Sequence, residues 1–310
     1  MASPGARGRR MQHLQTRFAE YGIRPNRRLG QNFLLDRNAV LAICRDAEVF
    51  ALDTVLEIGP GSGLLTTALA ATGAAVLSVE IDRALAALVR NETAAHPNVE
   101  IREGDILAGK HALDPAVLDR IAAIHADRPG GSLLCVSNLP YCIASPFVAN
   151  LCQNGLPWAR AVFLVQREEA ERFAADPGTG QYGSLSVVSQ LAADEVRVLR
   201  SMPPTVFWPR PRVQSSVVRL RFRSPEIRTA VPWRALRRVT SAIFAARRKK
   251  LRNALAALYP KGESGAADAL LARAGFSPDR RGETLSPDEL VSLAETAVET
   301  GVLPPDDDEA

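Results

Sequence analysis

The chain has 310 residues, 46% of them hydrophobic, and a formal net charge of +4, which suits one large domain or a medium domain with a smaller one. No apolar run reaches membrane-spanning length, the N-terminus lacks the apolar stretch of a secretory signal, and the four cysteines form no CxxC pair, so we expect a cytoplasmic protein without a membrane span, a disulfide framework or a metal site. The positive charge is concentrated in two blocks, with eight arginines against two acids in residues 1–37 and fourteen arginines or lysines against one acid in residues 205–252, which predicts a polyanionic partner.

Short β-type runs alternate with helical segments through the first two thirds of the chain. A basic N-terminal arm (1–25), expected to be flexible with a short helical stretch, precedes a helix at 37–48. The predicted strands that follow are 54–58, 75–80, 99–102, 132–137 and 161–166, with helices at 64–71 and 82–91, and then two strands at 195–200 and 215–222. Strands that alternate with helices predict a parallel sheet with covered faces, and the last two strands predict an antiparallel edge.

Beyond Pro225 the pattern is only helical, so we place a domain boundary near residue 224. The predicted helices are 232–258, 264–274 and 287–297, the last with Ser286 as its N-cap. The acidic tail (301–310) is predicted to be disordered.

A glycine-rich turn follows the first of the alternating strands, in the sequence Glu57-Ile58-Gly59-Pro60-Gly61-Ser62-Gly63. Such a turn lets the backbone approach a ligand closely and offers it the N–H groups of the next helix. Glu80 ends the second strand, where a carboxylate binds the hydroxyls of a ribose. The spacing E-x-G-x-G-x-G puts Leu64 at the third glycine position of a dinucleotide site and is typical of S-adenosylmethionine methyltransferases. Asp105, after the third strand, favours the same interpretation over an ordinary tight turn.

The tetrad Asn138-Leu139-Pro140-Tyr141 follows the fourth strand, at the sheet edge where ligands bind. It resembles the motif of amino-group methyltransferases that act on adenine. The exocyclic amine of adenine is a weak nucleophile, so its two N–H groups need acceptors, which the Asn138 side-chain oxygen and the Leu139 carbonyl supply. Pro140 stiffens the turn, and Tyr141 is placed to stack on the base. An Asx cap beside a packed tyrosine is the alternative interpretation.

Further motifs stand in order along the chain: Gly30-Gln31-Asn32-Phe33-Leu34, Gln166-Arg167-Glu168, Tyr182–Val187, Phe207–Val213, and Phe244 with Arg247-Arg248-Lys249 and Leu251. With the glycine turn and the tetrad, they make the chain resemble the KsgA/RsmA-type small-subunit ribosomal RNA adenine N6,N6-dimethyltransferases from about Gly30 to Leu255. One departure is Cys142-Ile143-Ala144, where the family usually has Asn-Ile-Ser or Asn-Ile-Thr.

The resemblance implies an α/β fold: a Rossmann-like class I methyltransferase sheet (26–224) and a smaller all-helical RNA-binding domain (225–300). It implies S-adenosyl-L-methionine as cofactor and an immature small ribosomal subunit as partner of a monomer. The target would be N6 of two adjacent adenosines near the 3′ end of 16S-type RNA. The implied cofactor contacts are Asn32, Leu34, Gly59, Glu80, Asp105 and Asn138, and we add Gly61 of the glycine turn to them. Phe207 would stack on the target adenine opposite Tyr141.

A run of cations on the predicted helix 232–258 is a candidate phosphate-binding surface, because it has no compensating acids close by in sequence. Its members are Arg247, Arg248, Lys249, Lys250 and Arg252. A solvated helix face is the alternative. Two other functions stay open: a large-subunit rRNA adenine N6-methyltransferase of the antibiotic-resistance type, and an RNA-binding ribosome-assembly factor whose chemistry is dispensable.

Overall fold

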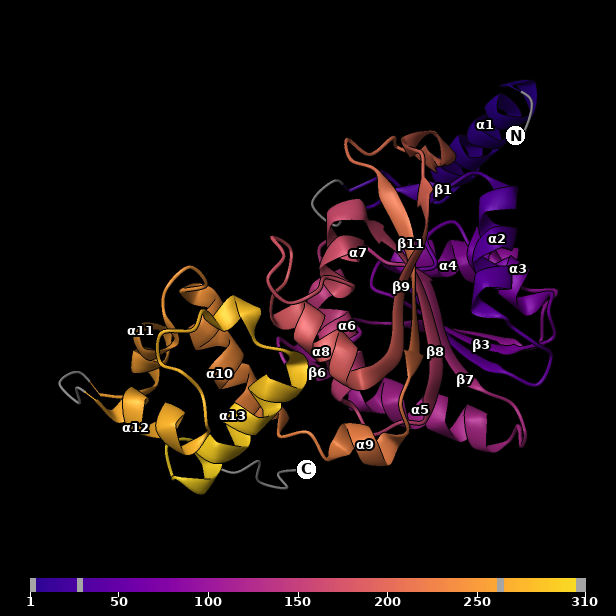
Figure 1. The fold of residues 1–310 in the computed structure, drawn as a ribbon. Coiled ribbons are helices and arrows are strands. Elements are labelled where there is room, and N and C mark those ends of the chain that lie inside the picture. The colour runs from indigo at the N-terminus through magenta and orange to yellow at the C-terminus, as the bar shows by residue number, and fades with distance from the viewer. Residues whose placement is uncertain (1–3, 27–29, 261–264, 305–310) are drawn as a thin grey trace. The chain divides into compact units, whose positions relative to one another are not determined.

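The computed structural model describes residues 4–26, 30–260 and 265–304 and contains a seven-stranded mixed sheet (Figure 1). Its order is β4-β3-β2-β7-β8-β11-β9. The strands are β2 (Thr54–Ile58), β3 (Ala75–Glu80), β4 (Val99–Glu103), β7 (Leu133–Asn138), β8 (Trp158–Gln166), β9 (Ala193–Met202) and β11 (Ser215–Phe222). The first five pair in parallel, β11 runs antiparallel to β8, and β9 occupies the edge. The predicted fold class is thereby confirmed.

The remaining elements within the described residues are two small sheets, thirteen α-helices and three 3₁₀ helices, at Pro204–Val206, Ala256–Leu258 and Gly282–Thr284. The small sheets are β1 (Phe33–Leu34) with β10 (Phe207–Trp208), and β5 (Leu107–Gly109) with β6 (Ala112–Leu113). The first eight helices are α1 (Pro4–Glu20), α2 (Arg37–Ala47), α3 (Leu64–Ala70), α4 (Arg83–Glu92), α5 (Pro115–Ala126), α6 (Ala144–Gln153), α7 (Arg167–Phe173) and α8 (Ser184–Ala192). The last five are α9 (Pro225–Thr229), α10 (Trp233–Ala245), α11 (Leu251–Leu255), α12 (Ala266–Arg273) and α13 (Pro287–Glu299). No helix in the described part of the chain is long and apolar enough to cross a membrane.

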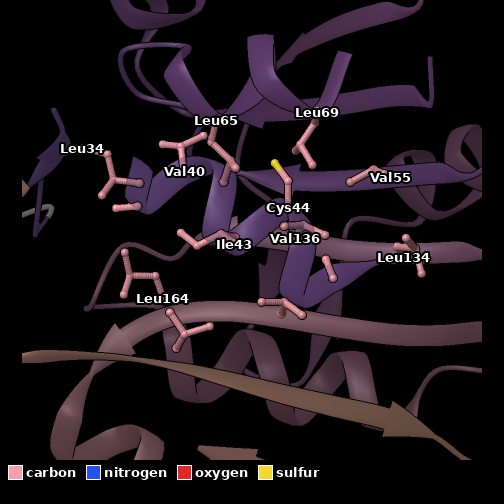
Figure 2. Close-up of a cluster of buried hydrophobic side chains, with 14 of the residues drawn as sticks. Leu34, Val40, Ile43, Cys44, Val55, Leu65, Leu69, Leu134, Val136 and Leu164 are labelled. Carbon is pink, nitrogen blue, oxygen red and sulfur yellow. The ribbon is translucent and has the colours of Figure 1, made fainter. Parts of the chain in front are cut away.

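The core of the sheet is filled by aliphatic side chains from one face of α2 and α3 and from the strands beneath them. Figure 2 labels Leu34, Val40, Ile43, Cys44, Val55, Leu65, Leu69, Leu134, Val136 and Leu164. Val40, Ile43 and Cys44 recur at helical spacing, which turns one face of α2 to the sheet. Burying each such side chain contributes about 1.5–3 kcal/mol. This packing holds the carboxyl ends of the strands in fixed positions.

Grouped by the contacts between Cα atoms, the chain forms two compact units. The first contains residues 1–151, 156–170 and 195–222, and the second contains residues 152–155, 171–194 and 223–310. Residues 171–194, which the sequence assigns to the sheet domain, join the second unit through Tyr182. Its hydroxyl donates to the Leu285 carbonyl over 2.8 Å, and its ring meets that of Phe244 edge to face. The predicted domain limits stay a prediction.

Part of the predicted N-terminal arm is packed in an apolar cluster. Leu14 and Phe18 lie on one face of α1, and Ile23 follows the helix; all three are buried in an apolar cluster. Two apolar side chains four residues apart on one helical face are enough to dock a helix that is otherwise basic. The helical stretch expected in the arm corresponds to α1, and the flexibility of the arm stays a prediction.

The predicted helix 232–258 is interrupted between α10 and α11. In one continuous helix, Arg248 and Arg252 would stand one turn apart as like charges, an unfavourable arrangement. The interruption instead lets Lys250 reach Asp279 over 3.0 Å. By contrast, Ser286 caps α13 as predicted, accepting from the Glu289 amide over 3.1 Å. Of the predicted disordered tail, residues 305–310 lie outside the described residues, whereas Leu303 is buried.

Candidate active site

A cavity that is partly open to solvent lies at the carboxyl ends of β2, β3 and β7. Its walls come from the entry segment (residues 30–35), the glycine turn (59–63), the segments after β3 and β4, and the tetrad loop (138–141). Ten of the predicted site residues line it together: Asn32, Leu34, Gly59, Gly61, Glu80, Asp105, Asn138, Leu139, Pro140 and Tyr141. Crossover connections bring strand ends far apart in sequence to one edge of the sheet, which explains the convergence.

The glycine turn lets two other cavity walls approach it. Gly59 and Gly61 have φ angles of 65° and 58°, in the left-handed region that favours glycine. A Cβ atom on Gly59 would lie 2.9 Å from Cγ of Pro140, and one on Gly61 would lie 2.9 Å from Cδ1 of Phe33. Side chains at these positions would therefore push away both the tetrad loop and the entry segment.

Glu80 is held in the cavity wall by main-chain donors. One carboxylate oxygen accepts from the Asp82 amide over 3.0 Å, and the other accepts from the Gly61 amide over 3.3 Å. Burial raises the pKa of this carboxyl, and both amides oppose that effect by stabilising the charged form. Since each oxygen has two lone-pair directions, the group retains acceptor capacity for the hydroxyls of a bound ribose.

Glu57, at the end of β2, is a second carboxyl in the cavity wall and is only 1% exposed. The Ser78 hydroxyl donates to its Oε2 atom over 2.6 Å. Burial raises the pKa of Glu57 to about 7, against the lowering effect of the Ser78 hydrogen bond, and the nearby negative charge of Glu80 raises it further. The site therefore contains a carboxyl that takes up or releases a proton near neutral pH.

Asn138 has its side-chain amide oriented by the entry segment. Its Nδ2 atom donates to the main-chain carbonyl of Asn32 over 3.1 Å, which leaves Oδ1 as the acceptor for another group. The next amide, that of Leu139, donates to the Leu164 carbonyl over 3.1 Å and so fixes the tetrad loop to β8. These bonds fix the side chain of Asn138 and the backbone of Leu139 before any ligand binds.

Tyr141 is anchored at its hydroxyl, which lies 2.7 Å from Oγ of Ser215, the first residue of β11. Burial raises the pKa of Tyr141, and the hydrogen bond with Ser215 works against this. Gly30 passes so close to the backbone of Tyr141 that a Cβ atom on it would lie 3.2 Å from the Tyr141 amide nitrogen. The orientation of this ring is thus set by residues that lie far from it in sequence.

Phe207 does not line this cavity. Its side chain is 1% exposed and packs in the core cluster shown in Figure 2, and its backbone pairs with Leu34 in the β1–β10 sheet. A ring that is buried in the core offers no face to a second aromatic group. The stacking of Phe207 on the target base opposite Tyr141 therefore has no support in the cavity lining and stays a prediction.

Three of the five cations in residues 247–252 are paired with acidic side chains, although no acid lies close to them in the sequence. Arg247 pairs with Glu283 over 3.0 Å, and Lys250 and Arg252 both reach Asp279, at 3.0 and 3.2 Å. Arg252 also lies 3.6 Å from Asp268. The compensating acids thus come from later in the chain. Arg248 and Lys249 are exposed and pair with no acid in the described ranges.

Two isoleucines in the cavity wall were not predicted from the sequence. Ile81, 54% exposed, follows Glu80, and Ile106 follows Asp105. Asp105 itself accepts from the Leu107 amide over 2.9 Å with one oxygen. The sequence did contain a pattern that could have identified them, because an acid is followed by isoleucine after each of two successive strands. Apolar side chains flanking a carboxylate suit a flat ring that also carries an amine.

Comparisons with known proteins agree with this geometry. A family model described as ribosomal RNA adenine dimethylase matches residues 22–295. The chain is 41% identical over 287 residues to the "Ribosomal RNA small subunit methyltransferase A" of Pelotomaculum thermopropionicum, covering 91% of this chain and 94% of that protein. It is 39% identical over 287 residues to the protein of the same name from Streptomyces coelicolor, covering 90% and 93%.

Two solved structures share the fold. A dimethyladenosine transferase from Plasmodium falciparum aligns with a TM-score of 0.69 at 22% identity, covering 87% of this chain and 98% of that one. The 23S rRNA methyltransferase ErmE aligns with a TM-score of 0.57 at 27% identity, covering 86% and 99%.

Proposed function

Since the chain belongs to the ribosomal RNA adenine dimethylase family, we propose that it transfers methyl groups from S-adenosyl-L-methionine to N6 of adenosines in small-subunit rRNA. In finer detail, the targets are two adjacent adenosines near the 3′ end of 16S-type RNA, and the product is N6,N6-dimethyladenosine. The chain acts as a monomer on an immature subunit in the cytoplasm. The observation that carries the proposal is the convergence of the tetrad, the glycine turn and Glu80 on one cavity.

The residues of the cavity fit the cofactor. Glu80 retains acceptor capacity for the ribose hydroxyls, and Asp105 retains it for the adenine amine. Ile81 and Ile106 supply apolar contacts for the faces of the adenine ring. The entry segment residues Asn32 and Leu34, with Gly59 and Gly61, hold the rest. When bound, the cofactor supplies an electrophilic methyl group on a positively charged sulfur.

The tetrad loop binds and orients the target adenine. The Oδ1 atom of Asn138 and the carbonyl of Leu139 accept the two N–H groups of the amine, which favours the pyramidal nitrogen needed for bond formation. Tyr141 stacks on the extruded base, and Ser215 holds the tyrosine hydroxyl. Unstacking the base costs a few kcal/mol, which the stacking and the two hydrogen bonds offset. The chain's residues act by positioning rather than as a strong base.

The exposed cations Arg248 and Lys249 contact RNA phosphates, whereas Arg247 mainly stabilises its own unit. Replacing Arg248 and Lys249 together by Gln should lower RNA affinity and flatten its log–log salt dependence by roughly 0.7–0.9 per lost phosphate contact. Filter binding over a salt series measures this. The control is Arg273→Gln, which removes an exposed cation of α12 in the same unit. Equal slopes for the double variant and the control would show a merely solvated surface.

Methylation of defined particles tests the proposed function directly. The full chain is incubated with isotope-labelled S-adenosylmethionine and with undermethylated small or large ribosomal subunits, and the modified nucleotides are mapped by mass spectrometry. We expect dimethylated adenosines only near the 3′ end of the small-subunit RNA. Label in large-subunit RNA would instead support the second candidate, a methyltransferase of the kind represented by ErmE, to which the chain is 27% identical.

A variant without methyl transfer distinguishes a methyltransferase from an assembly factor whose chemistry is dispensable. Asn138→Ala should abolish most methyl transfer while RNA binding persists. If a deletion strain grows as well with this variant as with the parent chain, methylation is dispensable and binding is the function. A growth defect equal to that of the deletion would assign the function to the chemistry.

A further inference from the structure

The N-terminal helix α1 packs against two walls of the cofactor cavity although it does not line the cavity itself. Its buried residues belong to one apolar cluster that contains Leu14, Phe18, Ile23, Phe33, Leu35, Leu85 and Leu88. Phe33, from the entry segment, and Leu85, from α4, also line the cavity. A single apolar cluster therefore connects α1 to both walls.

Phe18 contacts the ring that covers the glycine turn. The ring centroids of Phe18 and Phe33 are 4.7 Å apart with an interplanar angle of 86°, the edge-to-face arrangement that aromatic pairs prefer. Phe33 also lies so close to Gly61 that no Cβ atom would fit there. The Phe33 ring is thus held between α1 and the glycine turn.

Polar contacts fix α1 at both ends of this arrangement. Arg17 donates to Oε1 of Glu92 over 2.8 Å and to Oδ1 of Asn91 over 2.7 Å, at the end of α4. Arg10 donates to the carbonyl of Leu35 over 3.2 Å, at the end of the entry segment. The helix is therefore tied both to the entry segment and to α4, whose first turn follows Glu80.

We propose that Phe18 is a positioning residue for the cofactor: by fixing Phe33 over the glycine turn, it slows cofactor dissociation from a cavity that it does not line. The inference rests on the proposed function, because it takes S-adenosylmethionine or its demethylated product as the ligand of the cavity. Phe33 contacts both the glycine turn and Phe18. Truncating the side chain at position 18 would leave an empty space behind Phe33, and the Phe33 ring could then move away from the wall of the cofactor cavity. The same loss would leave the hydrogen-bonding groups of Glu80 and Asn138 in place.

The test is cofactor binding to the full-length Phe18→Ala variant, measured by titration calorimetry and by stopped-flow displacement. We expect the affinity for S-adenosylhomocysteine to fall about tenfold, mostly through faster dissociation. Gln15→Ala, at an exposed position of the same helix, is the matched control and should bind as the parent does. Phe18→Leu, which keeps much of the buried volume, should recover part of the lost residence time.

A purely structural role would lower the melting temperature of Phe18→Ala without changing the dissociation rate, and that result would overturn the inference. If Phe18→Ala does not fold, Arg17→Gln tests the same point at the surface of α1, with a dissociation rate raised about two- to threefold as the expected result. An unchanged rate in a folded Arg17→Gln would then count against the inference. Failure of the parent chain to bind either ligand would refute the proposed function itself.

Discussion

The buried carboxyl of Glu57 should make the stability of the protein fall as the pH rises towards neutrality. Its pKa in the folded chain is about 7, against an ordinary value of 4.5. Each tenfold change in proton affinity is worth about 1.4 kcal/mol, so ionising this group in the folded state costs about 3 kcal/mol more than in the unfolded chain. The folded state binds the proton more tightly, so this stability is fully present below pH 4.5 and is lost between about pH 4.5 and 7.

Glu57→Gln isolates this contribution, because an amide keeps an oxygen for the Ser78 hydroxyl but cannot ionise. Urea unfolding of the parent and the variant from pH 5 to pH 8 should show the parent losing about 2.5 kcal/mol relative to Glu57→Gln. Glu103→Gln, which removes an exposed carboxyl at the end of β4, is the control and should follow the parent. Parallel curves for parent and Glu57→Gln would refute the reasoning, because Glu57 would then titrate alike in the folded and unfolded chain.

Three other substitutions separate binding, orientation and packing. Glu80→Ala should weaken cofactor binding by about 1.5–3 kcal/mol through the lost ribose contacts, and an unchanged dissociation constant in calorimetry would contradict the assignment. Ser215→Ala should free the Tyr141 hydroxyl and slow single-turnover methylation about fivefold at unchanged cofactor affinity, since one hydrogen bond is worth about 1 kcal/mol; equal rates would show that Tyr141 needs no anchor. Phe207→Ala should cost about 3–5 kcal/mol of unfolding free energy in urea, as expected for a core aromatic residue; a stable variant that loses only methyl transfer would restore the stacking role.

The strands and the residues at their ends were predictable because both depend on local sequence. The β-type run before Gly59 and the acids that follow the next two strands mark the carboxyl edge of a parallel sheet, where ligands bind. The tetrad after β7 stands at the same edge. Short-range patterns therefore predicted which residues meet at the cavity, although their roles await the experiments above.

Tertiary structure alone decided the features that depend on partners distant in sequence. Phe207 looks like an exposed stacking residue until β10 pairs with β1, which places the ring in the core. The cations near Lys250 look uncompensated until residues such as Asp279 fold back on them. Likewise, the arginine-rich composition of α1 hides Phe18, whose burial depends on Phe33 in the entry segment. Sequence patterns report what a residue prefers locally, whereas burial and charge pairing depend on which distant residues the fold places beside it.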